Sequence, residues 1–126
     1  MKLDTIEIIT LFVPDIDKAR TFYASVFDAE IIHSDPVSAV LAFKGTMINL
    51  LDMQQTDELL APLTAAKNGA GMLLTVRVDD VDAECARLEE KGVSLVNGPI
   101  DRSWGRRTVC FADPGGNLWE FAQIIE

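Results

Sequence analysis

The sequence is poor in the residues that carry the commonest reaction chemistries. It contains one histidine, His33, and two cysteines, Cys85 and Cys110. A Ser–His–acid set is therefore possible only through His33. The two cysteines have no metal-binding spacing and are too few for a disulfide framework. No apolar run approaches the ~18 residues that a membrane span needs, and residues 1–4 lack the pattern of a signal peptide. We therefore expect a reduced, cytoplasmic protein with no membrane partner.

Positive charge is also scarce in this chain. Eleven Lys and Arg residues stand against twenty Asp and Glu residues, which gives a net charge of −9 over 126 residues. Nucleic acids and anionic membranes attract clustered positive charge, so neither is an expected partner. The same negative charge would raise the local concentration of a cationic small molecule. With 48% hydrophobic residues, the sequence is typical of one globular domain.

An internal repeat relates the two halves of the chain at an offset of 65 residues. Residues 11–17 (LFVPDID) align with residues 76–82 (VRVDDVD), and each segment predicts a strand, an acidic turn and the start of a helix. Apolar residues then recur at helical spacing: Ile16, Ala19, Phe22, Tyr23 and Val26 in the first copy, and Val81, Cys85 and Leu88 in the second. Asp15 or Asp17 and Asp80 or Asp82 are expected to cap these helices.

Further strands are predicted after each helix. In the first half they cover residues 29–33, 38–43 and 47–53, and in the second half residues 93–96, 108–112 and 117–124. Each half therefore has the order βαβββ. Module one covers about residues 5–53 and module two about residues 72–125. The linker, about residues 54–71, is expected to contain a short helix starting near Thr56 and Asp57 and to end in a turn at residues 68–71.

Alternation along the strands separates the two faces of each half. Leu74, Val76 and Val78 are uniformly apolar and should pack on the helix, whereas the other face carries Leu73, Thr75 and Arg77. The equivalent positions in the other central strands are Ile8, Thr10, Phe12, Met47, Asn49, Leu51, Leu118, Glu120 and Ala122. We expect these side chains to line one crevice with a floor of Ile8, Leu73, Asn49 and Glu120.

The two βαβββ halves, with DPGGNLWE (residues 113–120) entering the last strand, resemble the vicinal oxygen chelate superfamily over roughly residues 6–124. That superfamily includes glyoxalase I, extradiol dioxygenases and bleomycin resistance proteins. The resemblance implies a single α+β domain over residues 1–126, with two βαβββ modules forming curved half-barrel sheets. Superfamily members commonly pair modules across subunits, so the resemblance also implies a homodimer.

Enzymes of that superfamily hold a divalent metal ion through four positions, one in each first strand and one in each last strand. These positions correspond to Ile8, Asn49, Leu73 and Glu120 in this sequence. Two are aliphatic, Asn49 is a weak neutral ligand, and only Glu120 keeps the pattern. We therefore expect no metal and no other cofactor.

The segment SWGR (residues 103–106) resembles the Trp-Gly-Arg loop of bleomycin resistance proteins, which implies that the Trp104 indole stacks on the rings of a ligand. Arg106 and Arg107 are expected to fix this loop through carboxylates. The sequence thus favours a metal-independent protein that binds a small cationic or aromatic, antibiotic-like molecule. The expected ligand contacts are Trp104, Glu120, Asn49, Phe12 and Phe43, around Ile8 and Leu73.

Two other functions remain open. One is an isomerase or lyase that uses Glu120 as a proton-transfer group, or a displaced metal site formed by His33, Asp35 and Glu120. The other is a scaffold whose groove serves only dimerisation. His33 is expected at the end of a strand, as an exposed residue outside the ligand positions.

Overall fold

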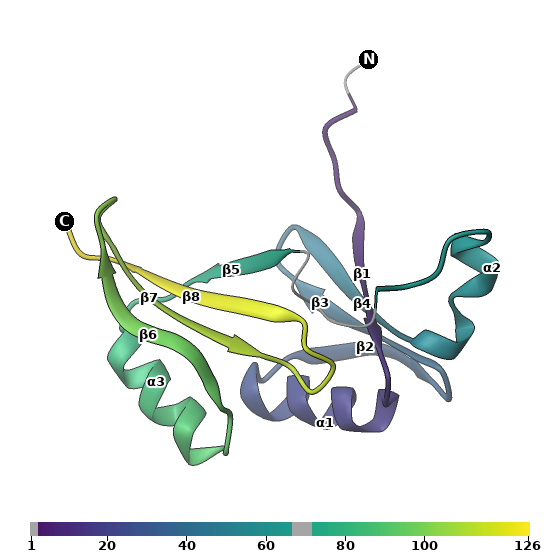
Figure 1. Ribbon diagram of the computed structural model, residues 1–126, viewed down its shortest axis with the longest axis horizontal. Coiled ribbons are helices and arrows are strands. Elements are labelled where there is room, and N and C mark those ends of the chain that lie inside the picture. Colours follow the sequence, from purple (N-terminus) through teal and green to yellow (C-terminus); the bar gives the residue numbers. More distant parts are fainter. Residues whose placement is uncertain (1–2, 67–71) are drawn as a thin grey trace. The chain divides into compact units, whose positions relative to one another are not determined.

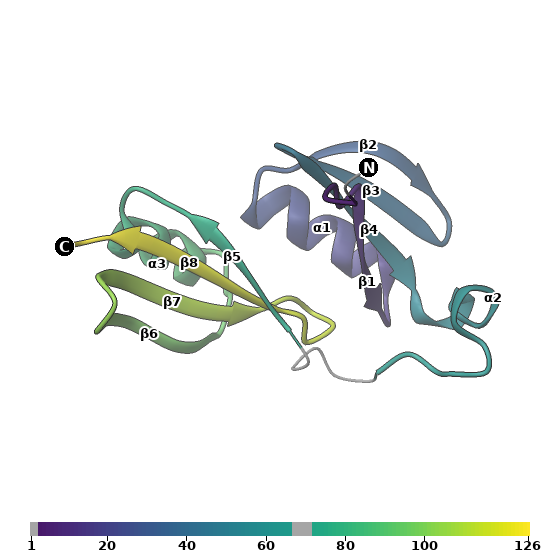
Figure 2. The same cartoon turned by 90° about the horizontal axis from the view of Figure 1, so that it is seen from above.

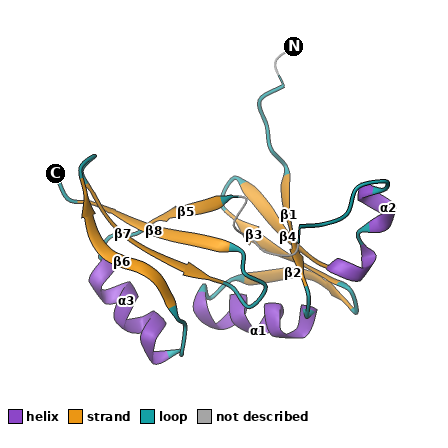
Figure 3. Ribbon diagram, viewed as in Figure 1, coloured by secondary structure: helices purple, strands orange, loops and turns teal. Residues whose placement is uncertain are grey.

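The structure is a computed structural model that describes residues 3–66 and 72–126. The chain divides into two units, Met1–Lys67 and Asn68–Glu126, and each contains a four-stranded sheet. Figures 1 and 3 show the elements of both units. The α+β fold with two βαβββ modules is confirmed. Within the described ranges, no helix is long and apolar enough to cross a membrane.

The first unit consists of one sheet, a helix that packs on it and two short helical segments after the last strand. Its elements are β1 (Ile8–Val13), α1 (Ile16–Val26), β2 (Glu30–Asp35), β3 (Ser38–Phe43), β4 (Thr46–Asp52), the 3-10 turn η1 (Met53–Gln55) and α2 (Asp57–Leu60). The strand order is β1-β4-β3-β2, with β1 parallel to β4 and the other pairs antiparallel. The predicted short helix after Thr56 is confirmed as α2. The predicted turn at residues 68–71 lies outside the described residues.

The second unit repeats this arrangement. Its elements are β5 (Leu73–Arg77), α3 (Val81–Glu90), β6 (Leu95–Arg102), β7 (Arg106–Ala112) and β8 (Leu118–Ile124). The strand order is β5-β8-β7-β6, with β5 parallel to β8. Figure 2 shows α1 and α3 lying each against its own sheet. The first and last strands of each unit are therefore neighbours at equivalent places.

Each helix starts at an aspartate that caps its first turn. The Asp15 carboxylate accepts a hydrogen bond from the backbone N–H of Lys18, and the Asp80 carboxylate accepts one from Ala83, both at 3.1 Å. These two caps are 65 residues apart, as the repeat predicts. Each cap satisfies a backbone N–H that the first helical turn leaves without an intrahelical partner.

The core of each unit lies between its helix and one face of its sheet. The buried side chains on the helix side are Leu11, Val13, Ile16, Ala19, Tyr23, Val26, Ala39, Leu41, Ile48 and Leu50 in the first unit, and Val81, Cys85, Leu88, Val109, Phe111, Trp119 and Phe121 in the second. These are the positions that alternation assigns to the helix side. The prediction of which side chains face the helix is confirmed for them. Leu51, Cys110 and Ala122 are also buried, on the opposite face of their sheets.

The edge strands β2 and β6 each contain a bulge at an equivalent place. In β2 the register shifts between Ile31 and His33, and in β6 it shifts between Leu95 and Asn97 and again before Ile100. The predicted strand at residues 93–96 was too short, because the Gly-Pro pair at residues 98–99 would interrupt a regular strand. Here the irregular edge strand accommodates that pair.

Gly98 lies where β6 passes closest to β7. Its φ is +96°, and an added Cβ would lie 2.9 Å from the Val109 Cα and closer still to the Thr108 carbonyl oxygen. Both partners are backbone atoms of the neighbouring strand, so no side chain can move aside. Gly45 also has a positive φ, +89°, but nothing lies within 4 Å of the added atom.

We expect Gly98→Ala to lower the free energy of unfolding more than the matched control Gly45→Ala. Gly45→Ala should cost about 1 kcal/mol for the left-handed backbone alone. Gly98→Ala should cost about 1–3 kcal/mol more, because the strands must separate to admit the methyl group. Urea denaturation of the two variants measures the difference. Equal losses would contradict the close approach of β6 to β7.

Candidate functional site

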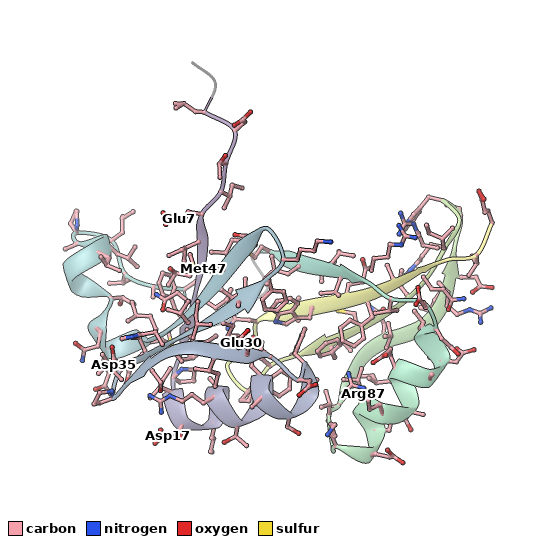
Figure 4. The ribbon with its side chains drawn as sticks, turned by 180° about the vertical axis from the view of Figure 1, so that it is seen from behind. Glu7, Asp17, Glu30, Asp35, Met47 and Arg87 are labelled. Carbon is pink, nitrogen blue, oxygen red and sulfur yellow. The ribbon has the colours of Figure 1, made fainter. Side chains whose placement is uncertain are left out.

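The candidate site lies on the sheet face opposite the helix in each unit, which we call the candidate face. Ile8 and Leu73 occupy this face at the start of β1 and β5, and they are 42% and 46% exposed. Apolar side chains that remain this exposed beside polar ones are a usual property of a ligand-binding surface. Figure 4 shows Asp17 on α1 and Arg87 on α3, on the helix side of each unit.

In the second unit, four side chains form a row across the sheet on this face. The strand register aligns Thr75 with Glu120, Glu120 with Cys110, and Cys110 with Asn97. The Thr75 hydroxyl donates a hydrogen bond to Glu120 Oε1 at 3.0 Å. Glu120 is half-buried and Thr75 is exposed. The Glu120 carboxylate is therefore fixed at one oxygen by a neutral donor and can accept further hydrogen bonds.

The first unit has an equivalent row, formed by Thr10, Asn49, Val40 and His33. The Asn49 side-chain amide donates to the Thr10 hydroxyl at 3.4 Å, a long hydrogen bond. Thr10 corresponds to Thr75, and Asn49 occupies the place of Glu120. His33 was expected at the end of a strand, away from these positions. The bulge in β2 places it opposite Val40, on the candidate face, where its side chain is 58% exposed and lies outside the four ligand positions, as expected.

His33 pairs with an aspartate that organises the turn between β2 and β3. His33 Nε2 lies 3.0 Å from Asp35 Oδ2, and Asp35 also accepts hydrogen bonds from Val37 N, Ser38 N and the Ser38 hydroxyl. These donors, with His33 as the largest cause, hold the pKa of Asp35 far below its ordinary value of 3.8. Asp35 was missed as a turn residue, although an aspartate followed by proline shortly before a strand is a common turn signal.

Neither cysteine is prepared for nucleophilic chemistry. Burial raises the pKa of the Cys110 thiol, and the Glu120 carboxylate raises it further, with Arg102 acting weakly in the opposite sense. Burial and Glu89 raise the pKa of Cys85. The thiolate is the reactive form of cysteine, so both shifts disfavour reaction.

Trp104 lies in the turn that connects β6 to β7 and is 68% exposed. The turn is tied at both ends by backbone hydrogen bonds of 3.1 Å, from Gly105 N to Arg102 O and from Ile125 N to Gly105 O. Gly105 has φ +81°, which favours glycine. The indole therefore projects from a backbone that is fixed to the sheet.

Two aromatic residues expected at the site lie on different faces of the first sheet. Phe12 pairs with Leu51, on the candidate face. Phe43 follows Leu41 on the helix face, and its ring centroid is 6.1 Å from that of Phe27 at the end of α1. Alternation along β3 therefore places Phe43, which is half-buried, on the helix face, and the expectation that it contacts a ligand stays a prediction.

The arginines of the β6–β7 hairpin also divide between the two faces. Arg107, on the helix side, forms ion pairs with Asp101 at 2.6 Å and Asp82 at 3.0 Å, which raise its pKa. Arg102 lies on the candidate face and donates to Thr108 Oγ1 and Asn97 Oδ1, both at 3.0 Å.

Arg106 directly faces Arg102 across the hairpin. It has no ion pair among the described residues. The expectation of a carboxylate partner was right for Arg107 and wrong for Arg106. Arg102 and Asn97 were missed as members of the candidate face, because the bulges that place them there leave no alternation signal in the sequence.

The turn before β8 is organised by a buried carboxylate. Asp113 is 5% exposed and accepts hydrogen bonds from Gly115 N at 2.9 Å, Asn117 N at 2.8 Å and Asn117 Nδ2 at 2.9 Å. These contacts explain why the segment reads DPGGN: each polar member has a partner within the turn. The turn sets the start of β8 and hence the position of Glu120.

Comparison with known proteins identifies the family that has this arrangement. The sequence profile of the Glyoxalase/Bleomycin resistance protein/Dioxygenase superfamily matches residues 5–121. The chain belongs to this superfamily. The uncharacterized protein YraH of Bacillus subtilis (strain 168) is 31% identical over 123 residues, which are 93% of this chain and 96% of YraH.

Two further proteins similar to this chain have different described functions. The mitochondrial methylmalonyl-CoA epimerase of Bos taurus is 29% identical, over 91% of this chain and 71% of the epimerase. The crystal structure of TnmS3, an antibiotic binding protein from Streptomyces sp. CB03234, superposes with a TM-score of 0.76 at 30% identity and covers 98% of both chains. Proteins similar to this chain therefore include one named as an epimerase and one described as antibiotic binding.

The four superfamily metal positions do not fit a metal ion in this chain. Ile8 and Leu73 have no lone pair to donate, and the Asn49 amide already donates to Thr10. Glu120 is the one charged ligand of the set. Among the described residues, no group of three or more His, Cys, Asp and Glu side chains is arranged to hold a metal. We derive no metal chemistry at these positions. The displaced set of His33, Asp35 and Glu120 draws on both units and stays a prediction.

We expect chelator-treated protein to show no one-to-one binding of zinc, nickel, manganese or ferrous ions, the last measured without oxygen. The reason is that three of the four positions offer no anionic ligand. Isothermal titration calorimetry tests this for each ion. One-to-one binding that disappears in both Glu120→Gln and His33→Asn would instead establish the displaced site.

The Asp35 contacts predict a pH dependence of stability. Because the folded state holds the Asp35 pKa below 3.8, it favours the carboxylate. The resulting stabilisation is complete above that pH and is lost as pH falls below it. We expect Asp35→Asn to be less stable than the natural protein at pH 7, with the difference shrinking below about pH 4. Ser38→Ala should behave in the same way to a smaller extent. Chemical denaturation between pH 7 and pH 3 measures this, and parallel curves would contradict it.

Proposed function

We propose that this protein binds a small aromatic molecule without using a metal ion. The observation that carries the proposal is the chemistry of the four superfamily metal positions. Glu120 alone bears charge there, and it is held by Thr75 within a row of neutral side chains. Such a face recognises a ligand through hydrogen bonds and apolar contact, but it does not chelate. The proposed contacts are Asn49, Phe12 and Ile8 in the first unit, and Glu120, Leu73 and Trp104 in the second unit, with Trp104 on the β6–β7 turn.

Trp104 supports the aromatic character of the ligand. A large exposed indole on a tethered turn offers a rigid stacking surface at small entropic cost. Isolated exposed apolar residues are common on proteins, but tryptophan at 68% exposure leaves a large apolar area in water. Covering that area with a planar ring would recover part of the hydrophobic free energy.

The similarity to TnmS3 supports an antibiotic-like ligand, since that protein is described as antibiotic binding. The expectation of a cationic ligand depends on the net charge of −9 of the whole chain. We place the binding in the cytoplasm on the basis of the two free cysteines. We also propose a homodimer, because the end strands β2 and β6 expose Ile32, Val96 and Ile100 to between 41% and 55%.

A catalytic function has one specific observation in its favour. Glu120 is half-buried, and Thr75 fixes one of its carboxylate oxygens by a hydrogen bond without neutralising the charge. A carboxylate held in this way can abstract a proton from a bound carbon acid. The 29% identity with an epimerase agrees with such a role. An isomerase or lyase that uses Glu120 is therefore the second candidate.

We expect Trp104→Ala to weaken binding of a planar aromatic antibiotic by about 1–3 kcal/mol, because the stacking surface is lost. Trp104→Phe, the matched control, should recover most of the affinity. Glu120→Gln should weaken binding less, since the amide still accepts a hydrogen bond. Calorimetric titration with a panel of planar antibiotics measures these changes. Unchanged affinity in Trp104→Ala would remove this turn from the site.

The same variants separate the other candidates. If Glu120 is a proton-transfer group, Glu120→Gln should abolish turnover of a carbon-acid substrate while its denaturation curve stays unchanged. If the turn serves only dimerisation, Trp104→Ala should shift the sedimentation profile toward monomer with no ligand present. Either result, obtained without a loss of ligand affinity in Trp104→Ala, would overturn the proposed binding function.

A further inference from the structure

The candidate face of the second unit is positively charged, in contrast to the chain as a whole. The strand register places Arg77, Arg102 and Arg106 on this face together with one carboxylate, Glu120. Three positive charges therefore stand against one negative charge on a face of a protein whose net charge is −9. Since a local field depends mainly on nearby charges, the whole-chain charge is a poor guide to the ligand here.

Two of these arginines form a like-charged pair. Arg102 and Arg106 lie directly opposite each other at the end of the β6–β7 hairpin. Directly opposite like charges on one face of a sheet destabilise it, because their Cβ atoms are only about 4.5–5.5 Å apart. Among the described residues, no carboxylate forms an ion pair with either side chain. The hairpin thus keeps a repulsive arrangement that its own sequence does not neutralise.

Arg102 is held in place by neutral groups. Its Nε donates to Thr108 Oγ1 and its Nη2 donates to Asn97 Oδ1, each at 3.0 Å. These bonds orient the guanidinium without cancelling its charge. A guanidinium oriented in this way is suited to a planar or tetrahedral oxyanion, because its remaining N–H groups keep a fixed geometry.

Arg107 shows that the same hairpin can neutralise an arginine. It lies between Arg106 and Thr108 in the chain but on the helix side, where Asp101 and Asp82 both pair with it. On the helix side of the hairpin the arginine is therefore paired with carboxylates, whereas on the candidate face the arginines have no ion pair among the described residues. Only the candidate face leaves the positive charges to be neutralised from outside.

We propose that Arg102 and Arg106 bind an oxyanion group of the ligand, a carboxylate or a phosphate, beside the Trp104 ring. Trp104 lies between them in sequence, in the turn that joins their strands. This inference rests on the proposed binding function and narrows its ligand to an aromatic acid. An oxyanion between the two guanidinium groups would remove their repulsion and form charge-assisted hydrogen bonds.

Three probes of nearly equal shape test the charge preference. They are 2-naphthoate, its neutral amide 2-naphthamide, and the cation 2-naphthylmethylammonium, titrated calorimetrically at low and high potassium chloride. We expect naphthoate to bind at least about tenfold more tightly than the other two, with the difference shrinking as salt rises. A separate titration with inorganic phosphate, followed through the arginine Nε–H signals by NMR, tests whether the two arginines bind a phosphate rather than a carboxylate. It should shift Arg102 and Arg106 and leave Arg107 unchanged.

Arg106→Gln is the decisive variant, because Arg106 forms no ion pair among the described residues that would be lost with its charge. It should reduce naphthoate affinity by about tenfold and leave naphthamide affinity unchanged. Without probe it should be at least as stable as the natural protein in urea, since the repulsion with Arg102 is gone. The matched control Arg107→Gln makes the same charge change on the other face. It should leave both affinities unchanged.

The outcomes separate this inference from the proposed function. If naphthamide or the cation binds as tightly as naphthoate, and Trp104→Ala weakens that binding, the oxyanion site is overturned while aromatic binding stands. Equal losses of naphthoate affinity in Arg106→Gln and Arg107→Gln would also overturn it, because the effect would then be one of general charge. If none of the three probes binds and phosphate shifts no arginine signal, both the site and the aromatic binding function are overturned.

Discussion

The alternation of side chains across two four-stranded sheets, each covered on one face by a helix, is the constraint on which the rest of this structure depends. One face of each sheet must be apolar to pack on α1 or α3, and the buried residues satisfy this. The other face is free from that demand and carries threonine, asparagine, glutamate and arginine beside apolar residues such as Ile8 and Leu73. The parallel pairing of β1 with β4 and of β5 with β8 then fixes which of these side chains are neighbours.

Regular elements of this arrangement could be predicted from the sequence, because they follow from periodic patterns. The repeat, the capping residues Asp15 and Asp80 and the face assignment of Glu120 all depend on period-two or helical spacing. The bulges do not. One extra residue in an edge strand reverses the alternation beyond it, so His33 and Asn97 reach the candidate face without any periodic signal.

Partners across the sheet were equally hard to predict. A sequence shows that Arg106 and Arg107 are adjacent, but not that their side chains meet different surroundings. The structure gives Arg107 two carboxylates and places Arg106 opposite Arg102. Phe43 is a similar case, because its aromatic character suits a ligand site as well as the core, and only its place in β3 shows that it lies on the helix face. The net charge of the whole chain is a poor guide to the charge of the ligand for the same reason, since it averages over both faces of each sheet.

The equivalence of Thr10 with Thr75, and of Asn49 with Glu120, has an evolutionary consequence. Both pairs keep a hydrogen bond between the first and last strands of their unit, but Asn49 donates to Thr10 whereas Glu120 accepts from Thr75, so the backbone tolerates a neutral donor or a charged acceptor at the same place. A duplicated half can therefore lose its charge at this place while its counterpart retains it. Each copy can change its chemistry separately, and the shared backbone geometry need not be rebuilt when one of them takes on a new partner.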